Sequence, residues 1–411
     1  MTTQASPLID PDIALQRLLA AARVLGETHT VPLAAALGRV LAQDVHSTID
    51  VPPADNTAMD GYALRSADVT APGARLPVSQ RIPAGAMPQP LQAGTAARIF
   101  TGGLIPPGAD AVVMQEQCSA EADAVRIDVQ PKAGDWVRRR GLDVQAGSVV
   151  LHAGQRLRPQ DLGLAASVGV ATLNVRRQPR VAILFTGDEL AMPGEPLRPG
   201  AIYNSNRFVI QALLQAAGCE VTDFGIVPDR LEATRAVLRQ AAQQHDLILS
   251  TGGMSVGEED HVKPAVQSEG ALDLWQIAMK PGKPLAYGHV RRGDGQGEAA
   301  FIGLPGNPVS SFITYLLFVR PYLLALQGVT DTAVQTLPVR AAFDWPRPDK
   351  RREFLRVRLN ERGGLDLFAN QSSGVLTSVV WADGLVDNPA GQSIRAGDTV
   401  RFLPMSELIN R

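Results

Sequence analysis

Five short segments combine glycine, acidic or lysine residues directly after apolar runs of the kind that form buried strands. They are Thr186-Gly187-Asp188-Glu189-Leu190, Pro228-Asp229, Thr251 to Asp260, Lys280-Pro281-Gly282-Lys283-Pro284 and Pro305-Gly306-Asn307-Pro308. In an open parallel sheet, ligands bind in the crevice beyond the carboxyl ends of the strands. We therefore expect the five segments to line one pocket.

The charged residues of these segments indicate the chemistry of the pocket. Acidic side chains without a histidine partner favour a hard cation such as Mg²⁺, held by carboxylates and by phosphate oxygens of a ligand; the candidates are Glu189, Asp229 and Asp260. Lys280 and Lys283 bracket Pro-Gly and are suited to neutralise an oxyanion. Phosphate chemistry is therefore the leading reaction class.

Each segment also has a purely structural interpretation. Gly252, Gly253 and Gly306 can simply make tight turns. Asp229 with Glu232 three residues later is typical of a helix capping box, and the two lysines can be solvated loop charges. The prediction of a site depends on the convergence of five segments and not on any one of them.

Composition and missing motifs exclude several classes of protein. The 39 Lys and Arg residues nearly balance the 41 Asp and Glu residues, which argues against a surface that tracks nucleic acid. The sequence lacks a Walker A motif, a GxGxxG after a strand and a GxSxG elbow, and its two cysteines and six histidines show no metal-ligand spacing. Ordinary P-loop, dinucleotide and serine hydrolase chemistry is disfavoured.

The elements that must position the five segments follow from hydrophobic periodicity. Buried-strand runs at 181–185, 221–227, 247–249 and 301–304 alternate with helical stretches at 207–217, 231–243 and 309–326, which predicts a parallel, doubly wound α/β domain. We expect a multidomain α/β protein with four parts. These are a helical and extended linker domain (1–48 and 147–178), an inserted mostly-β domain (49–146), the α/β domain (179–328) and a C-terminal β domain (329–411).

Read together, the motifs resemble a known family. The five segments and Asn204-Ser205-Asn206 are similar to the three-layer molybdopterin-binding domain that MogA, MoeA and gephyrin share. The stretches 52–63, 101–113 (Thr101-Gly102-Gly103 through Ala111-Val112-Val113) and 141–144 (Gly141-Leu142-Asp143-Val144) resemble the MoeA branch alone. The resemblance covers nearly the whole chain in matching order.

The resemblance implies a reaction and a set of residues. The implied activity is that of a molybdopterin molybdenumtransferase, which inserts molybdate into adenylylated molybdopterin and releases AMP with Mg²⁺. The implied catalytic residues are Asp60, Thr101, Asp143, Glu189, Asp229 and Asp260, the last three also as metal ligands. The expected substrate-binding residues are Thr186, Gly187, Asp188, Ser205, Asn206, Gly252, Gly253, Ser255, Lys280, Lys283, Pro305, Gly306, Asn307, Pro308, Ser310, Arg352 and Ser373.

The resemblance further implies a homodimer in which the β domain of one subunit faces the α/β cleft of the other. MogA-type adenylyltransferases and maturation proteins of molybdoenzymes are the implied partners. We expect a cytoplasmic protein without nucleic-acid or membrane partners, because the first residues lack a basic and apolar signal pattern and Arg320-Pro321 ends the apolar run 312–319. Two alternatives remain, a non-enzymatic gephyrin-like scaffold and a molybdopterin adenylyltransferase.

Overall fold

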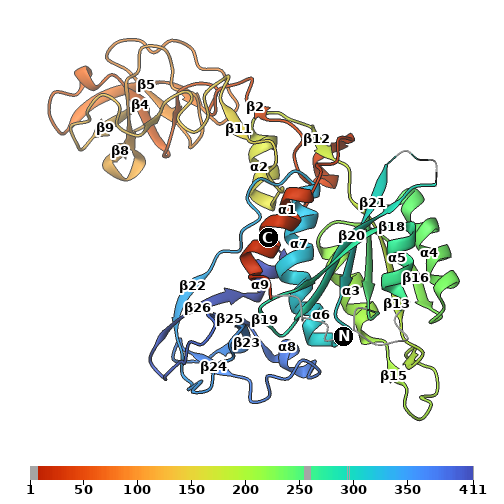
Figure 1. The fold of residues 1–411 in the computed structure, drawn as a ribbon. Coiled ribbons are helices and arrows are strands. Elements are labelled where there is room, and N and C mark those ends of the chain that lie inside the picture. The colour runs from red at the N-terminus through yellow and green to blue at the C-terminus, as the bar shows by residue number, and fades with distance from the viewer. Residues whose placement is uncertain (1–7, 254–260, 294, 296, 411) are drawn as a thin grey trace.

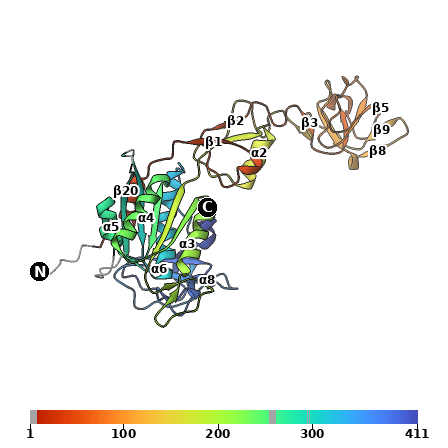
Figure 2. The same ribbon diagram turned by 90° about the vertical axis from the view of Figure 1, so that its right-hand side faces the viewer.

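The computed structural model describes residues 8–253, 261–293, 295 and 297–410. Figures 1 and 2 show an elongated molecule with a β-rich unit at one end and an α/β unit together with a C-terminal β unit at the other. A small unit that contains β2, β11 and α2 joins the two ends.

The central sheet of the α/β unit has six strands in the order β16, β13, β17, β21, β20 and β18. Their bounds are Glu220–Val227, Arg180–Thr186, Leu247–Thr251, Glu298–Leu304, Pro284–Arg291 and Gly270–Gln276. The first four strands are parallel, whereas β20 pairs antiparallel with both β21 and β18. The expectation of a wholly parallel sheet is therefore wrong, and the sheet is mixed. Since two reversals restore the direction, β18 runs the same way as β21, and its carboxyl end lies at the same edge.

Helices cover both faces of this sheet, as the doubly wound pattern predicts. On one face, α4 (Leu231–Gln244) and α5 (Val262–Glu269) pack over residues such as Leu184, Ile248 and Phe301. On the other face, α3 (Ser205–Ala216) and the helical stretch 308–326 cover the second core cluster. The short strands β14 (Leu190–Ala191) and β15 (Ile202–Tyr203) pair beside the sheet.

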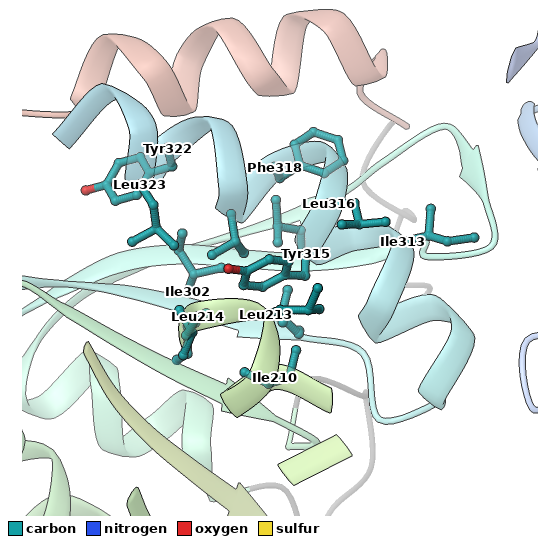
Figure 3. Close-up of a cluster of buried hydrophobic side chains, with 14 of the residues drawn as sticks. Ile210, Leu213, Leu214, Ile302, Ile313, Tyr315, Leu316, Phe318, Tyr322 and Leu323 are labelled. Carbon is teal, nitrogen blue, oxygen red and sulfur yellow. The ribbon is translucent and has the colours of Figure 1, made fainter. Parts of the chain in front are cut away.

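The helical stretch 308–326 consists of α6 (Pro308–Thr314), the π-helical turn η4 (Tyr315–Val319) and α7 (Arg320–Leu326). The helix continues through Pro321, although proline has no backbone N–H to donate to a regular α-helix. Pro321 lies in the first turn of α7, which directly follows the wider π turn. Tyr315, Leu316 and Leu323 pack with α3 and Ile302 in the core (Figure 3). The stretch is long and apolar enough to cross a membrane, but 83% of its most apolar window is buried inside the protein. Core packing therefore accounts for its apolar composition.

The β-rich unit contains a six-stranded sheet in the order β7, β4, β6, β5, β9 and β8. The bounds are Ala111–Met114, Gly61–Leu64, Ala96–Ile99, Ala74–Ile82, Ala124–Ile127 and Cys118–Ala120. The 3₁₀ turns η2 (Ser66–Asp68) and η3 (Gln115–Gln117) follow β4 and β7, and β3 (Asn56–Thr57) pairs with β10 (Val137–Arg138). Two small clusters of buried aliphatic residues form its core.

Two antiparallel strand pairs carry the chain out to the β-rich unit and back. They are β1 (Thr28–Pro32) with β12 (Thr172–Arg176) and β2 (Val45–His46) with β11 (Val149–Leu151), with η1 (Leu33–Ala35) and α2 (Pro159–Ser167) alongside. The first helix, α1 (Pro11–Ala21), is capped by the Asp10 side chain and buries Ala14 and Leu18 in the core of the α/β unit. This helix thus packs with the α/β unit, against α7.

The C-terminal unit is built on a sheet in the order β19, β23, β25, β26 and β22, with β24 beside β23. Its strands are Met279–Lys280, Arg352–Leu359, Gly384–Asn388, Thr399–Pro404, Leu337–Arg340 and, for β24, Leu365–Leu367; α8 (Thr377–Trp381) and α9 (Met405–Asn410) complete it. Strand β19 leaves the α/β unit and pairs with β23, so that Lys280 lies beside Glu353. This pairing fixes the C-terminal unit against the predicted pocket.

Candidate functional site

A cavity of about 710 Å³ lies where the carboxyl edge of the central sheet meets the C-terminal unit. Most of the residues that line it come from three of the five predicted segments. They are Gly252, Gly253, Gln276, Lys280, Pro281, Gly282, Lys283, Pro284, Pro305, Gly306, Asn307, Ser310, Arg351, Gln371, Ser372 and Ser373. The predicted convergence of these three segments is therefore present in the structure.

Glycines form the floor of the cavity because the backbone leaves no room for a side chain. Gly252 and Gly253 have φ angles of 87° and 66°. A Cβ atom on Gly252 would lie 2.7 Å from the carbonyl oxygen of Thr186, and one on Gly253 would lie 2.4 Å from a methyl group of Val262. Thr186 thus lies against the cavity floor without lining the cavity.

Further contacts hold the other segments together. The side-chain amide of Asn206 donates to the carbonyl oxygen of Gly306 at 2.8 Å. The N–H of Val309, in the first turn of α6, donates to the carbonyl oxygen of Ser373 at 3.0 Å. The C-terminal unit therefore forms one wall of the cavity, and Asn206 supports the loop at Gly306 from behind.

Three cationic side chains line the cavity, namely Lys280, Lys283 and Arg351. The Lys280 ammonium lies 3.5 Å from a carboxylate oxygen of Asp349 and 3.4 Å from one of Glu353. The Glu353 side chain is only 1% exposed and also accepts hydrogen bonds from the Trp345 indole at 2.7 Å and from the backbone N–H of Asp349 at 3.1 Å. These bonds fix Lys280 at the cavity wall before any ligand binds.

Arg351 forms a bidentate pair with Asp349 at 3.0 and 2.9 Å. Hydrogen bonding from the Arg351 side chain is the main reason why the pKa of Asp349 lies far below its ordinary value, and Lys280 adds a Coulomb contribution. Asp349 therefore stays ionised and holds both cations.

Arg352, which we expected to bind substrate, does not line this cavity. Its guanidinium pairs with Asp387 at 2.5 and 2.6 Å and with Asp12 at 2.9 Å, and hydrogen bonding to Asp387 raises its pKa. Arg351, which directly precedes β23, lines the cavity instead. The sequence-based prediction therefore named the neighbouring arginine, and Gln276, Gln371 and Ser372 were not predicted either.

Two of the predicted acidic residues of the α/β unit, Glu189 and Asp229, lie outside the cavity lining. Glu189 is exposed, and its carboxylate folds back over Gly187, where a Cβ atom would lie 2.6 Å from Oε2. Asp229 is half-buried after β16, and Asp188 and Ser205 also lie outside the lining. Ser255 and Asp260 fall outside the described residues. Within the described ranges, His, Cys, Asp and Glu form no group of three able to hold a metal ion.

Asp60 and Thr101 meet on the β-rich unit. This unit lies at the opposite end of the molecule from the α/β unit (Figures 1 and 2). One oxygen of Asp60 accepts hydrogen bonds from both the N–H and the hydroxyl group of Thr101, each at 2.7 Å. The bond from the Thr101 N–H is the main cause that lowers the pKa of Asp60. Asp143 is exposed on a loop whose backbone bonds to Val51.

A mixed α/β domain with a cation-lined cavity at its strand ends, joined to two β units, defines a multidomain protein whose cavity is suited to an anionic ligand. Three family models match the chain in order. They are the MoeA N-terminal region (domain I and II) at 9–169, a probable molybdopterin binding domain at 182–325 and the MoeA C-terminal region (domain IV) at 338–405. The chain belongs to the MoeA family of molybdenum cofactor biosynthesis proteins.

Curated relatives and a solved structure agree with this assignment. A molybdopterin molybdenumtransferase of Haemophilus influenzae is 37% identical over 93% of this chain and 95% of its own length. One of Nostoc sp. is 38% identical over 92% and 89%. The crystal structure of the molybdopterin biosynthesis moeA protein of Pyrococcus horikoshii is 29% identical, covers 97% of this chain and all of its own, and has a TM-score of 0.83.

Proposed function

We propose that the chain is a molybdopterin molybdenumtransferase, which inserts molybdate into adenylylated molybdopterin with release of AMP. One observation carries the proposal. In a chain that is 37% and 38% identical to enzymes of this name, Lys280, Lys283 and Arg351 line one cavity at the carboxyl edge of the sheet. Molybdate and phosphate groups are both oxyanions, and a cavity of reduced dielectric strengthens their attraction to fixed cations.

The cationic residues and the glycines of the cavity contribute to ligand binding in different ways. Lys280 and Arg351 are already oriented by Asp349 and Glu353, so little side-chain freedom is lost when an oxyanion binds between them. The glycine floor at Gly252 and Gly253 lets a ligand approach the backbone closely. We assign molybdate to the lysine side and the nucleotide to the side of the acidic loops.

The acidic loops would hold Mg²⁺ through Glu189, Asp229 and Asp260. An all-carboxylate donor set fits this hard cation, which would offset the charge of the nucleotide phosphates.

The complete site would be composite and would form in a homodimer. Asp60, Thr101 and Asp143 would come from one subunit, and the cavity with its acidic loops from the other. The support is the separation within one chain, where the β-rich unit and the α/β unit lie at opposite ends of the molecule (Figure 2). A twofold axis would create two such sites.

The remaining expectations accompany this function. The enzyme would work in the cytoplasm with adenylylated molybdopterin and molybdate as substrates, and with MogA-type adenylyltransferases and molybdoenzyme maturation proteins as partners. The four-part division at 48, 146, 178 and 328 is retained as a proposal, with the addition that the helix at 11–21 packs on the α/β unit.

An AMP-release assay tests the function. Purified protein is given adenylylated molybdopterin with Mg²⁺, and AMP is measured with and without molybdate. Molybdate-dependent release supports the transferase. Absence of release would favour a scaffold, whereas adenylylation of free molybdopterin from ATP would favour an adenylyltransferase.

A further inference from the structure

A cluster of arginines and aromatic rings, which the reaction described above does not use, lies on the β-rich unit. Strand register places Arg81 of β5 and Tyr62 of β4 on either side of Arg98 of β6. Phe100 follows β6, directly before Thr101. We call Tyr62, Arg81, Arg98 and Phe100 the arginine cluster.

The two guanidinium groups of the cluster converge on one ring. The Cζ atoms of Arg81 and Arg98 lie 4.8 and 4.7 Å from the centre of Phe100, and Arg98 also lies 5.1 Å from the centre of Tyr62. Arg98 donates to the side chain of Gln115 at 2.6 Å and to the carbonyl oxygen of Gly61 at 3.3 Å. Arg98 is therefore fixed in place, while Arg81 is exposed.

The charge of this cluster is only partly balanced by its neighbours, since Arg98 makes a Coulomb contribution to the lowered pKa of Asp60. No carboxylate of the described residues lies within ion-pair distance of Arg81 or Arg98, whereas Arg75 of the same strand pairs with Glu121 and Asp123. Two cations that share one ring repel each other, and an anion bound between them would remove that cost. The nearest site carboxylate, Asp60, uses one oxygen to accept from Thr101.

We propose that Arg81 and Arg98 form a binding site for a tetrahedral oxyanion beside the Asp60–Thr101 pair. The planar guanidinium fork matches the oxygens of phosphate and related anions. Arg81 stacks on Phe100 with its N–H edge available, whereas Arg98 offers only the N–H groups that its bonds to Gln115 and Gly61 leave unused. The occupant is a phosphate group of the nucleotide substrate, and this identification rests on the proposed function. Binding of an oxyanion as such does not depend on it.

Protection from chemical modification tests this site without measuring turnover. Phenylglyoxal modifies accessible arginines, and peptide mass spectrometry follows Arg81 and Arg75 separately in the full-length protein. AMP at saturation should slow modification of Arg81 by about threefold or more, because a bidentate pair covers the reactive edge. Arg75 is the matched control, an exposed arginine on the same strand whose rate should stay constant.

The choice of anion identifies the occupant. Protection by AMP but not by malonate, a dianion without tetrahedral geometry, supports the phosphate assignment. Protection by molybdate alone would overturn the nucleotide assignment, and equal rates for Arg81 with every anion would overturn the site itself.

Variants connect the site to substrate binding. In the AMP-release assay, Arg81→Ala and Arg98→Lys should raise the KM for adenylylated molybdopterin by about tenfold with a smaller change in kcat, whereas Arg75→Ala should stay within about twofold. Unchanged KM in both variants would contradict the proposal. If the wild-type protein releases no AMP, the proposed transferase function is contradicted. The protection experiment would still test whether Arg81 and Arg98 bind an oxyanion.

Discussion

The cavity of the α/β unit and the Asp60–Thr101 region of the β-rich unit differ in how much of a site each provides. The cavity has a volume of about 710 Å³, a floor built from glycine and three cations, two of which are held by buried or half-buried carboxylates. The Asp60–Thr101 pair lies on a surface, with Thr101 exposed and its hydroxyl group directed to Asp60.

This difference indicates whether each region can bind a ligand without a second protein surface. The cavity can bind an oxyanion without help, since its cations are oriented before the ligand arrives. The Asp60–Thr101 pair has a fixed geometry but no enclosure, and water would screen its charge. A second surface that covers it would supply the enclosure, which is the physical reason for proposing a composite site.

Lys280→Ala should have the largest effect in the cavity. Loss of an oriented ammonium group should weaken the response to molybdate by about tenfold or more, since such a contact contributes on the order of 1 to 3 kcal/mol. Lys283→Ala should have a smaller effect in the same direction, because Lys283 is exposed. The check is the molybdate dependence of AMP release. If both variants lose nucleotide binding and keep the molybdate response, the two sides of the cavity have been assigned in reverse.

Arg351 and Arg352 provide a matched pair that separates binding from stability. Arg352→Ala leaves Asp387, whose side chain is 3% exposed, with only the longer contact to Arg401 at 3.4 Å. It should lower the free energy of unfolding by about 2 to 3 kcal/mol and leave the KM for molybdate nearly unchanged. Arg351→Ala should instead raise that KM with a smaller loss of stability. Thermal unfolding and steady-state kinetics on both variants measure the two effects. A raised KM for Arg352→Ala together with an unchanged KM for Arg351→Ala would contradict the assignment of Arg351 to the site.

The ion pairs at the cavity wall should show a pH dependence of defined sign. The pKa of Asp349 is lowered in the folded protein, so its contribution to stability is fully present above its ordinary value of 3.8 and is lost as pH falls through the folded pKa. The difference in unfolding free energy between the wild type and Asp349→Asn should be constant from roughly pH 5 to 8 and should shrink below about pH 4. Urea titrations across this range measure it. A difference that grows on acidification would show that Asp349 is not ionised in the folded state.

Trp136→Asn is expected to have the smallest effect, and it concerns the β-rich unit. The cavity uses glycine for its left-handed backbone, whereas Trp136 adopts φ 56° and is, among the described residues, the only non-glycine with positive φ. Asparagine tolerates this conformation and relieves about 1 kcal/mol of strain, but Trp136 is only 40% exposed, so the replacement also removes buried ring area. The two effects oppose each other, and the free energy of unfolding in chemical denaturation should change by less than about 1 kcal/mol. A loss of more than about 2 kcal/mol would show that the packing of the indole outweighs the backbone strain.

Much of the fold follows from local patterns in the sequence. The helix predicted at 231–243 is present as α4 (Leu231–Gln244), and the buried strands that precede the loops at Thr186 and Pro305 are present as well. These elements are determined by periodicity and by proline and glycine signals, which are local. The edge strand β18 and the antiparallel strand β20 next to it were not predicted, because a short apolar run carries no information about strand direction.

The candidate site was only partly predictable for a similar reason. Glycine and lysine segments identified the cavity, since strand ends of one direction converge at one edge. Arg351 was missed because the choice between two adjacent arginines depends on the pairing of β19 with β23, a contact between residues more than seventy positions apart. The meeting of Asp60 and Thr101 likewise depends on the β4–β6 pairing and on no sequence motif.

Subunit mixing tests the composite site most directly. Asp60→Ala and Lys280→Ala proteins are mixed under conditions that allow exchange and are assayed at limiting molybdate, where each variant alone is strongly impaired. Heterodimer formation is verified with differently tagged chains. Each heterodimer would contain one site with both defects and one with neither. Random exchange makes about half of the dimers heterodimers, so roughly a quarter of all sites should be intact and wild-type activity should recover in that proportion. No recovery despite verified exchange would show that both residues serve the same subunit's site and would contradict the account.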